Sequence, residues 1–518
     1  MYKLLHYQLL KFLPPFLIAV FSTATVFAGS QQQTDVQPVA MPPALTNTDG
    51  SHPLALIPNR SGSALIAITP SPSTPGLLYV NPTNPRYFTD GSGKAIYLTG
   101  SHTWANFQDA GTSNPPAAFG YNGYLNFLQA NNHNFFRLWA WEQSKWLTGA
   151  TYYFSPSIYQ RPGPGTALDG GKKFDVTKFN QAYFNRMRSR IIAAGNKGIY
   201  VSIMLFDGWS VDCAKNGPCN TNANPWRGHP FNSSNNINGI NGDPNNDKSG
   251  SETHTLQISA ITARQKAYIR KVINTVNDLD NVLYEISNES HSNSQAWQYY
   301  MIDYIKSYEA TKPKQHPIGM TVEYPGGSNS ELFSASNHAD WVSPNGDTYK
   351  TNPDAATGNK VIIVDSDHLW GEGGDRIWVW KSFTRGLNLL FMDCYQASFC
   401  TSGVFTPNSP TRLSIVANMG YVRDYADRMN LKRMTPRTST SACSTQYCLV
   451  WSGRQYLVYR PSSSGSVTVN LSAASGQLSY EWFNPATGKI AKTGTTTGGA
   501  SRTFSSPFSG DAVLYIHK

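Results

Sequence analysis

The sequence predicts an α/β fold, a (β/α)8 TIM barrel followed by a small antiparallel β-sandwich domain. Three observations lead to this prediction. Short apolar runs of β-strand type alternate with longer amphipathic segments between about residues 80 and 435. Near-continuous apolar strands that alternate with helices are typical of a parallel sheet buried on both faces. From about residue 440, apolar and polar residues alternate between Gly, Ser and Thr turns, as in antiparallel sheets.

The chain begins with a segment that has the composition of a secretory signal. "MYKLLHYQLLK" supplies positive charge, "FLPPFLIAVF" is apolar, and "TVFAGS" offers small residues for cleavage after Ala28. An uncleaved membrane anchor is the less favoured alternative, because the apolar stretch is short and interrupted by proline. We therefore expect residues 1–28 to be a signal peptide and the protein to be secreted, either extracellular or periplasmic. Residues 29–78, rich in Ser, Thr, Pro, Gln and Asn, are expected to be a linker or poorly ordered arm.

Eight apolar runs define the expected barrel domain, residues 79–437. In chain order they are "AIYLTGSHTW", "NFFRLWAWE", "IYVSIMLFDGW", "VLYEISNES", "PIGMTVEYP", "WVSPNGD", "VIIVDSDHLWG" and "LNLLFMDCY". Helical patterns separate several of them, for example "DVTKFNQAYFNRMRSRIIAAGNKG" and "TARQKAYIRKVINTVNDLD". An open, doubly wound sheet is the alternative, and eight units make it less favoured. The longest insertion is expected after the third strand, at about residues 210–255.

The C-terminal segment, residues 438–518, is expected to be the β-sandwich. Its strand patterns are "YCLVWS", "QYLVYRP", "SVTVNLS", "LSYEWFNPATGKI" and "AVLYIHK", and no helical pattern lies among them. No pair of carboxylates suited to catalysis occurs there. We therefore expect this domain to pack on the barrel and to act in stability or attachment.

Composition and charge narrow the possible partners. The net charge is +10, but the basic residues are dispersed, which favours a solvated surface over a polyanion site. We therefore expect no nucleic acid partner and, after signal cleavage, no membrane contact. The 13 Trp, 28 Tyr and 24 Phe residues suit sugar rings, because an aromatic face buries C–H groups while hydroxyls stay hydrogen-bonded at the edge.

The six cysteines form three close pairs, which predicts the disulfides Cys213–Cys219, Cys394–Cys400 and Cys443–Cys448. Metal ligation is less favoured, because no pair has the two-residue spacing of zinc sites. The Asx-rich loop at 231–254 contains "DPNNDKSGSE", whose alternating Asp and Asn resemble a calcium loop. Lys248 and His254 stand where an EF-hand needs Gly and Glu, so an ordinary Asx-turn loop is favoured. We expect no metal and no cofactor.

Polar residues follow most of the expected strands, at the end where TIM barrels carry their chemistry. The candidates, in chain order, are His102, Trp104, Arg137, Trp141, Glu142, Asp207, Asn288, Glu289, Glu323, Asp365, Asp367, His368 and Trp370. Together they predict a pocket rich in carboxylates and lined by tryptophan.

Two carboxylates across a pocket are what glycoside cleavage requires. Glu289 suits the acid, because an apolar strand end raises the pKa of a carboxyl. Asp365 and Asp367 suit the nucleophile or base, held ionised by Arg137, and Asn288 suits a sugar hydroxyl. The alternatives are that Glu289 is an ion-pair partner and that one of the two aspartates caps the following helix.

The motifs "NPRYFTDGSGKAIYLTGSHTW", "NFFRLWAWE", "VLYEISNES" and "VIIVDSDHLWG" resemble secreted bacterial barrels related to glycoside hydrolase family 140, the apiosidase-like group of clan A type. The tail, with "EWFNPATGKI" and "PFSGDAVLYIHK", is similar to the "putative collagen-binding domain of a collagenase". The resemblance implies Glu289 as acid/base and Asp367 as nucleophile. That family more often has Asp at the first position and Glu at the second, and here the two are exchanged.

The sequence thus predicts a secreted glycoside hydrolase that acts on a poly- or oligosaccharide. The alternative is a non-catalytic carbohydrate- or matrix-binding protein on an inactivated barrel. A protease is not favoured, because neither a Ser-His-Asp set nor an H-E-x-x-H helix can be placed. The sugar, its linkage, the stereochemical course and the oligomeric state stay open, as does the choice between Asp365 and Asp367.

Overall fold

The computed structural model describes residues 75–393, 395, 406–462 and 464–518. The predicted signal peptide, most of the predicted linker and the predicted bridge Cys394–Cys400 lie outside these residues. The other two bridges, Cys213–Cys219 and Cys443–Cys448, are formed as predicted. Within the described ranges, no helix has the length and apolar character needed to cross a membrane.

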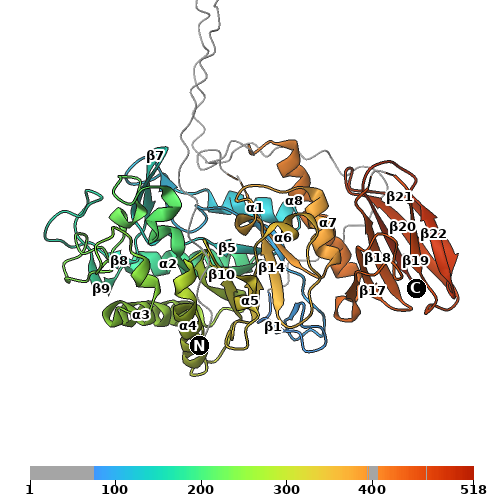
Figure 1. Ribbon diagram of the computed structural model, residues 1–518, viewed down its shortest axis with the longest axis horizontal. Helices are drawn as coiled ribbons and strands as arrows, with labels where there is room; N and C mark the ends of the chain where they lie inside the picture. Colours follow the sequence, from blue (N-terminus) through green and yellow to red (C-terminus); the bar gives the residue numbers. More distant parts are fainter. Residues whose placement is uncertain (1–74, 394, 396–405, 463) are drawn as a thin grey trace, which may run out of the picture. The chain divides into compact units, whose positions relative to one another are not determined.

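Eight parallel strands form the barrel, which confirms the predicted fold class (Figure 1). In chain order they are β3 (Thr99–His102), β5 (Phe135–Leu138), β10 (Tyr200–Asp207), β11 (Val282–Asn288), β12 (Ile318–Thr321), β13 (Trp341–Ser343), β14 (Val361–Asp365) and β15 (Asn388–Met392). Neighbours in the sheet follow the chain order, and β15 pairs with β3.

The first two barrel strands, β3 and β5, meet where the ring closes. The backbone N–H of Asn134 donates to the carbonyl of Thr99 over 2.9 Å, and the Asn134 side chain accepts from the Thr99 N–H over 3.0 Å. Gly100 permits this approach, because a Cβ there would lie 2.0 Å from the carbonyl oxygen of Phe135. These contacts join the two ends of the eight-stranded sheet.

Helices follow the barrel strands and lie outside them (Figure 1). They are α1 (Tyr121–Ala130), α2 (Gln181–Gly195), α3 (Ser259–Val276), α4 (Gln295–Glu309), α5 (Asn329–Leu332), α6 (Asp347–Thr351), α7 (Arg376–Thr384) and α8 (Pro410–Arg428). One predicted helical pattern begins differently. Its first residues form strand β9 (Asp175–Phe179), and the Asn180 side chain then caps α2 by accepting from the N–H of Ala182. Valine, threonine and phenylalanine favour the strand.

The strands bury both faces, with a period of two. On β10, Val201, Ile203 and Leu205 face the helix layer. The inward face carries a separate apolar cluster toward the N-terminal ends of the strands: Leu98, Phe135, Tyr200, Leu283, Trp341, Val361, Ile363 and Leu390. Leu78 and the hairpin of β1 (Tyr79–Val80) and β2 (Phe88–Thr89) belong to this cluster. Apolar packing therefore fills one end of the barrel, and charged side chains occupy the inward positions nearer the C-terminal strand ends.

Two insertions carry extra structure. The one after β5 contains β6 (Lys145–Thr148) and β7 (Ala150–Ser155), which form a three-stranded sheet with β4 (Asp109–Gly111), and β8 (Tyr159–Gln160), which pairs with β9. The other, residues 208–258, follows β10 and contains the Asx-rich loop. There Asn245 accepts from the N–H of Asp247 over 3.0 Å, and Asp247 accepts from the N–H of Ser249 over 2.7 Å, which are contacts of the Asx-turn type.

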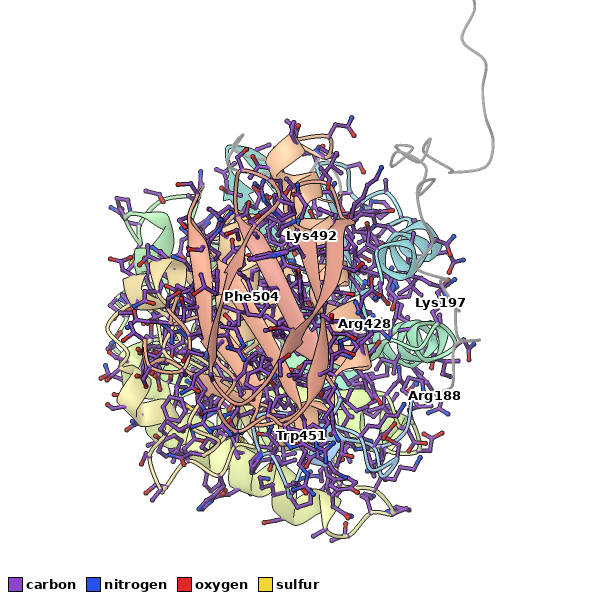
Figure 2. All side chains as sticks on the ribbon, turned by 90° about the vertical axis from the view of Figure 1, so that its right-hand side faces the viewer. Arg188, Lys197, Arg428, Trp451, Lys492 and Phe504 are labelled. Carbon is purple, nitrogen blue, oxygen red and sulfur yellow. A yellow bond between two sulfur atoms is a disulfide. The ribbon has the colours of Figure 1, made fainter. Side chains whose placement is uncertain are left out.

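The C-terminal domain contains two antiparallel sheets, as predicted (Figure 2). The larger has the order β16 (Thr435–Arg437), β17 (Cys448–Trp451), β18 (Gln455–Arg460), β23 (Ala512–His517), β20 (Gln477–Asn484), β21 (Lys489–Thr497), and the smaller pairs β19 (Ser466–Asn470) with β22 (Ser501–Ser505). Strand β16 precedes the expected boundary at residue 438 and pairs with β17. Phe504, labelled in Figure 2, belongs to the apolar cluster between the sheets.

The other face of the larger sheet packs on barrel helices α7 and α8. The Trp380 ring lies 6.2 Å from Tyr459 and 5.8 Å from Phe483. The Tyr425 hydroxyl donates to Glu481 over 2.7 Å. The expected packing of the tail on the barrel is thus confirmed, and both parts share one hydrophobic core.

Candidate active site

A buried arginine organises the charged part of the barrel interior. Arg137 of β5 donates from Nε and Nη2 to Glu285 of β11, over 2.7 and 2.5 Å, and from Nη1 to Asp365 of β14 over 2.8 Å. All three side chains are at most 1% exposed. Burial disfavours the guanidinium charge, but the two carboxylates outweigh it and raise the pKa of Arg137. Arg137 therefore stays charged at the centre of the barrel.

Asp365 uses both of its carboxylate oxygens in fixed contacts. Oδ2 accepts from Arg137, while Oδ1 accepts from His102 Nε2 and from the backbone N–H of Asp367, both over 3.0 Å. Burial raises the pKa of Asp365, but His102 and Arg137 lower it more, so that it lies below its ordinary range. Asp365 also caps the short helix Ser366–His368, which is the alternative role considered for one of the two aspartates.

Asp367 has the opposite environment. Its side chain is 8% exposed, and within the described part of the chain its buried Oδ2 has no hydrogen-bond partner. Arg137 Nη1 lies 3.6 Å from that oxygen. Burial, together with the charges of Glu289 and Asp365, raises the pKa of Asp367 well above its usual value. This carboxyl is therefore available to a ligand.

Glu289 directly follows β11 and is held in an unusual backbone conformation. Its φ is +43°, in the left-handed region that residues other than glycine rarely adopt. The Trp209 indole donates from Nε1 to Glu289 Oε2 over 2.5 Å, and the Lys215 ammonium donates to its carbonyl. A Cβ at Gly208 would lie 2.2 Å from that carbonyl oxygen, so glycine is required there. Strained residues held by several contacts are common at functional sites.

Glu289 and Asp367 behave as a pair. Burial raises the pKa of Glu289, and the charge of Glu289 is a main reason why the pKa of Asp367 is raised. Two buried carboxyls whose charges repel resist double ionisation, so their titrations are coupled. They stand at the C-terminal ends of the fourth and seventh barrel strands.

Asn288 and His368 are fixed next to this pair. Arg137 can only donate, so the atom of Asn288 that faces its Nη2 at 2.8 Å is the amide oxygen. That oxygen also accepts from His368 Nε2 over 3.2 Å, and the Ser343 hydroxyl donates to His368 Nδ1 over 2.9 Å. Burial lowers the pKa of His368 to about 3, so the imidazole is neutral. Among the described residues, the Asn288 amide group has one long contact, 3.4 Å to Asp207.

Two other predicted site residues are buried in polar networks of their own. Glu142 accepts from His254 over 3.1 Å and from the backbone N–H of Asp207 over 3.0 Å, and His229 lies 3.4 Å away. Burial raises the pKa of Glu142, but the two histidines bring it down to about 2. Burial raises the pKa of Asp207 itself to about 7. Glu142 thus holds the insertion of residues 208–258 to β10.

Glu323, after the fifth barrel strand, lies beside another carboxyl. It is fully buried, and its carboxyl interacts with Glu331 of α5. Burial and this second carboxyl raise the pKa of Glu323 to about 8, so it is protonated at neutral pH.

The tryptophans form a continuous aromatic cluster next to the pair. Ring centroids are 5.6 Å apart for Trp139 and Trp141, 5.6 Å for Trp141 and Trp146, and 6.4 Å for Trp146 and Trp209. Trp141 is only 3% exposed, so its ring is buried within this cluster. Trp104, which is half-buried, packs on Trp139 at 6.4 Å. Trp370, 38% exposed, lies edge-on to Trp378.

Three residues of this site were not among the sequence candidates. Glu285 was visible as a lone charge within an apolar strand, and Trp209 as an aromatic residue after the third strand. Lys215 had no such signal, because only the folding of the Cys213–Cys219 loop brings it to Glu289. Across the described ranges, no cluster of three or more His, Cys, Asp and Glu side chains is arranged to hold a metal.

Two protein-family models match parts of the chain. Residues 438–516 match the "Putative collagen-binding domain of a collagenase", in agreement with the resemblance of the tail. Residues 143–324 match a "Domain of unknown function (DUF6298)", which includes Glu289 but ends before Asp367. No curated protein matches the chain.

Solved structures of glycoside hydrolases share the fold. One is a glycoside hydrolase family 5 protein from Bacteroides vulgatus, with a TM-score of 0.58 and 13% identity over 86% of this chain and 94% of that one. Another, described as a glycoside hydrolase, has a TM-score of 0.51 and 12% identity over 86% and 98%. At these identities the likeness establishes the fold, a barrel of the kind glycosidases use. The finer relation to family 140 stays a prediction.

Proposed function

We propose that this protein is a secreted glycoside hydrolase in which Glu289 is the acid/base and Asp367 the nucleophile or base. The observation that carries the proposal is the buried pair of carboxyls at strand ends four and seven. Burial raises the pKa of both, and the charge of Glu289 raises that of Asp367 further. Glycosidases of both stereochemical types need one protonated and one ionised carboxyl on either side of the scissile bond. A pair that holds one proton is already in that state.

In the proposed reaction, Glu289 transfers its proton to the glycosidic oxygen as the bond to the anomeric carbon breaks. Asp367 supplies electrons on the other side, either by bonding to that carbon or by taking a proton from the attacking water. Arg137 faces Asp367 at 3.6 Å, so that the carboxylate is stabilised when Glu289 holds the proton. Asp365 keeps Arg137 and the backbone of Asp367 in position.

Substrate contacts are expected from the amide group of Asn288, which can donate further hydrogen bonds, and from partly exposed aromatic rings. The Asn288 amide group can donate to a sugar hydroxyl, because its oxygen is already occupied by Arg137 and His368. Trp104 and Trp370 offer partly exposed aromatic faces of the kind that stack on sugar rings. His102, Trp141, Glu142, Asp207 and Glu323 are buried, so we propose that they support the site rather than contact the sugar.

The C-terminal domain is proposed to stabilise the barrel or to attach the protein to a carbohydrate or protein matrix. Its match to a collagen-binding model and its shared core with α7 and α8 support this. The bond that is cleaved is then set by the barrel alone.

The test is a screen of the purified protein for release of reducing sugar from plant and microbial polysaccharides, and of aryl alcohol from aryl glycosides. The matched control is Asp367→Asn, prepared in the same way. Turnover by the native protein that the variant lacks supports the proposal. Sugar binding without turnover by either protein supports instead a binding protein on an inactivated barrel.

A further inference from the structure

A cavity lies beside the insertion that follows β5. Its volume is about 210 Å³, and its lining includes Lys145, Trp146, Thr151, Asp169, Asn222 and Arg227. This is smaller than the roughly 300–1,000 Å³ of sites that enclose a whole drug-sized ligand. The cavity thus suits a single ring or substituent of a longer molecule that extends beyond it.

The charges around this cavity are unbalanced. The carboxylate of Asp169 accepts two bonds from Arg161, over 2.5 and 2.6 Å, and one from Ser144 over 2.5 Å, so its charge is already compensated. Lys145 and Arg227 form no ion pair with any acidic side chain in the part of the chain that the structure describes. The Lys145 ammonium lies 5.7 Å from the centre of the Tyr153 ring, over its face. Lys145 and Arg227 therefore line the cavity without an ion-pair partner among the described residues.

Aromatic rings connect the cavity to the proposed catalytic pair. Trp146 lines the cavity, and its Nε1 donates to the Ala223 carbonyl over 3.1 Å, which fixes the indole plane. Its ring lies 6.4 Å from Trp209, whose Nε1 bonds Glu289. A glycan bound at Glu289 can therefore reach the cavity across a surface of two tryptophans. An aromatic face next to polar groups is the usual composition of a sugar-binding site.

We propose that this cavity binds an anionic sugar unit, carrying a carboxylate or a sulfate ester, of the same glycan that is cleaved at Glu289 and Asp367. The inference rests on the proposed function and adds the class of its substrate. The planar fork of Arg227 can pair with two oxygens of either group, and Lys145 adds a second charge. Trp146 supplies the face for the ring, while Asn222 and Thr151 supply hydroxyl partners.

The test measures binding rather than turnover, by calorimetry on the full chain with Asp367→Asn so that no substrate is consumed. The carboxylate probes are alginate oligosaccharides and their carboxyl-reduced, neutral forms. The sulfate probes are sulfated galactan oligosaccharides and their desulfated forms. Polyglutamate serves as an anion that is not a sugar. Each is tested against Lys145→Ala/Arg227→Ala.

The matched control is Lys197→Ala/Lys492→Ala, which removes the same charge from the surface elsewhere. Figure 2 shows Lys492 on the strands of the C-terminal domain and Lys197 away from it. The Lys197 ammonium donates a 3.2 Å hydrogen bond to Gln129. A long-range effect of the net charge of +10 would weaken binding equally in both double variants.

The expected result is that one anionic probe binds and its neutral form binds at least tenfold more weakly. The Lys145/Arg227 variant should lose about 10- to 100-fold in affinity for that probe, and the control variant should lose little. The probe that behaves in this way identifies the group as carboxylate or sulfate. Equal losses in both double variants, equal binding of neutral forms, or binding of polyglutamate as tight as that of the sugars would overturn the inference. If the native protein turned over no glycan, that would contradict the proposed function instead, because binding is measured separately from turnover.

Discussion

The backbone N–H of Asp367 donates a hydrogen bond of 3.0 Å to the carboxylate of Asp365. This contact separates the roles of two aspartates that are only two residues apart. Asp365 is saturated by that bond, by His102 and by Arg137, whereas the buried Oδ2 of Asp367 has no hydrogen-bond partner among the described residues. We therefore propose that Asp365 positions Asp367 and that Asp367 is the carboxyl that reacts.

Replacing Asp367 should therefore remove turnover and spare stability, whereas replacing Asp365 should lower stability and spare more of the turnover. Asp367→Asn should abolish turnover but leave the free energy of unfolding unchanged or higher, because it relieves repulsion with Glu289. Asp365→Asn should destabilise the fold by about 3 kcal/mol, because it leaves Arg137 with one buried carboxylate fewer. It should retain far more turnover than Asp367→Asn. Urea unfolding and turnover of both variants test this, and the reverse pattern of turnover would show that Asp365 is the reacting group.

The Asp367→Asn variant should also lower the pKa of Glu289. The negative charge of one carboxyl disfavours ionisation of the other, so removing the charge at 367 lets Glu289 ionise at lower pH. Glu289 is expected to stay above the usual value of about 4.3, since burial, the largest cause of its raised pKa, remains. The measurement is a carboxyl titration by carbon NMR, with Glu289→Gln used to assign the signal. An unchanged or higher pKa in the variant would mean that the two groups do not interact.

The loop closed by Cys213 and Cys219 should be needed for turnover, because it carries the Lys215 ammonium to the carbonyl of Glu289. Replacing both cysteines by serine should lower turnover about tenfold or more, the effect of losing one charged hydrogen bond. Lys215→Met should do the same. The control is serine at Cys443 and Cys448 in the C-terminal domain, which should affect stability by about 2 kcal/mol but not the turnover of folded protein. Equal turnover in all three variants would show that Lys215 does not contribute to turnover.

Asp207 should make stability depend on pH. Burial raises its folded-state pKa to about 7, whereas an unfolded aspartate titrates near about 3.9. The native state therefore binds a proton that the unfolded state releases between these values, and this stabilisation is lost as the pH rises from about 4 through 7. Asp207→Asn keeps a neutral side chain beside Ser210, so relative to the native protein it should gain up to about 4 kcal/mol over that interval. Unfolding of both proteins from pH 4 to 8 tests this, and a difference that is constant with pH would contradict it.

The barrel and several of its charged positions could be predicted because their cause is local. Arg137 lies within an apolar strand, Asp365 ends one and Glu289 follows one. Parallel strands bring such ends to one side of a barrel. The alternation of the tail likewise predicts two faces, one within the sandwich and one that packs on α7 and α8.

Other features depend on long-range packing, which decides the direction of a side chain. Glu142 and Glu323 both follow barrel strands, but the first is engaged by two histidines of the next insertion and the second by Glu331. Strand β9 was hidden in a helical pattern, although both its Val, Thr and Phe residues and its pairing with β8 favour the strand. Lys215 lies in a loop whose path depends on a disulfide, so spacing in the sequence carried no information about it.

The most direct test of the central claim is the turnover of Glu289→Gln on two kinds of substrate of the native protein, a natural glycan and an aryl glycoside with an activated leaving group. Glutamine keeps the shape of the side chain but has no proton to donate. Turnover of the glycan should fall by roughly 10² to 10⁴, the usual scale of general acid catalysis, while the aryl glycoside should be affected much less because its leaving group needs little protonation. Asp367→Asn, measured beside it, should fail on both. If Glu289→Gln turns over the natural glycan as fast as the native protein does, Glu289 is not the proton donor and the proposed mechanism is wrong.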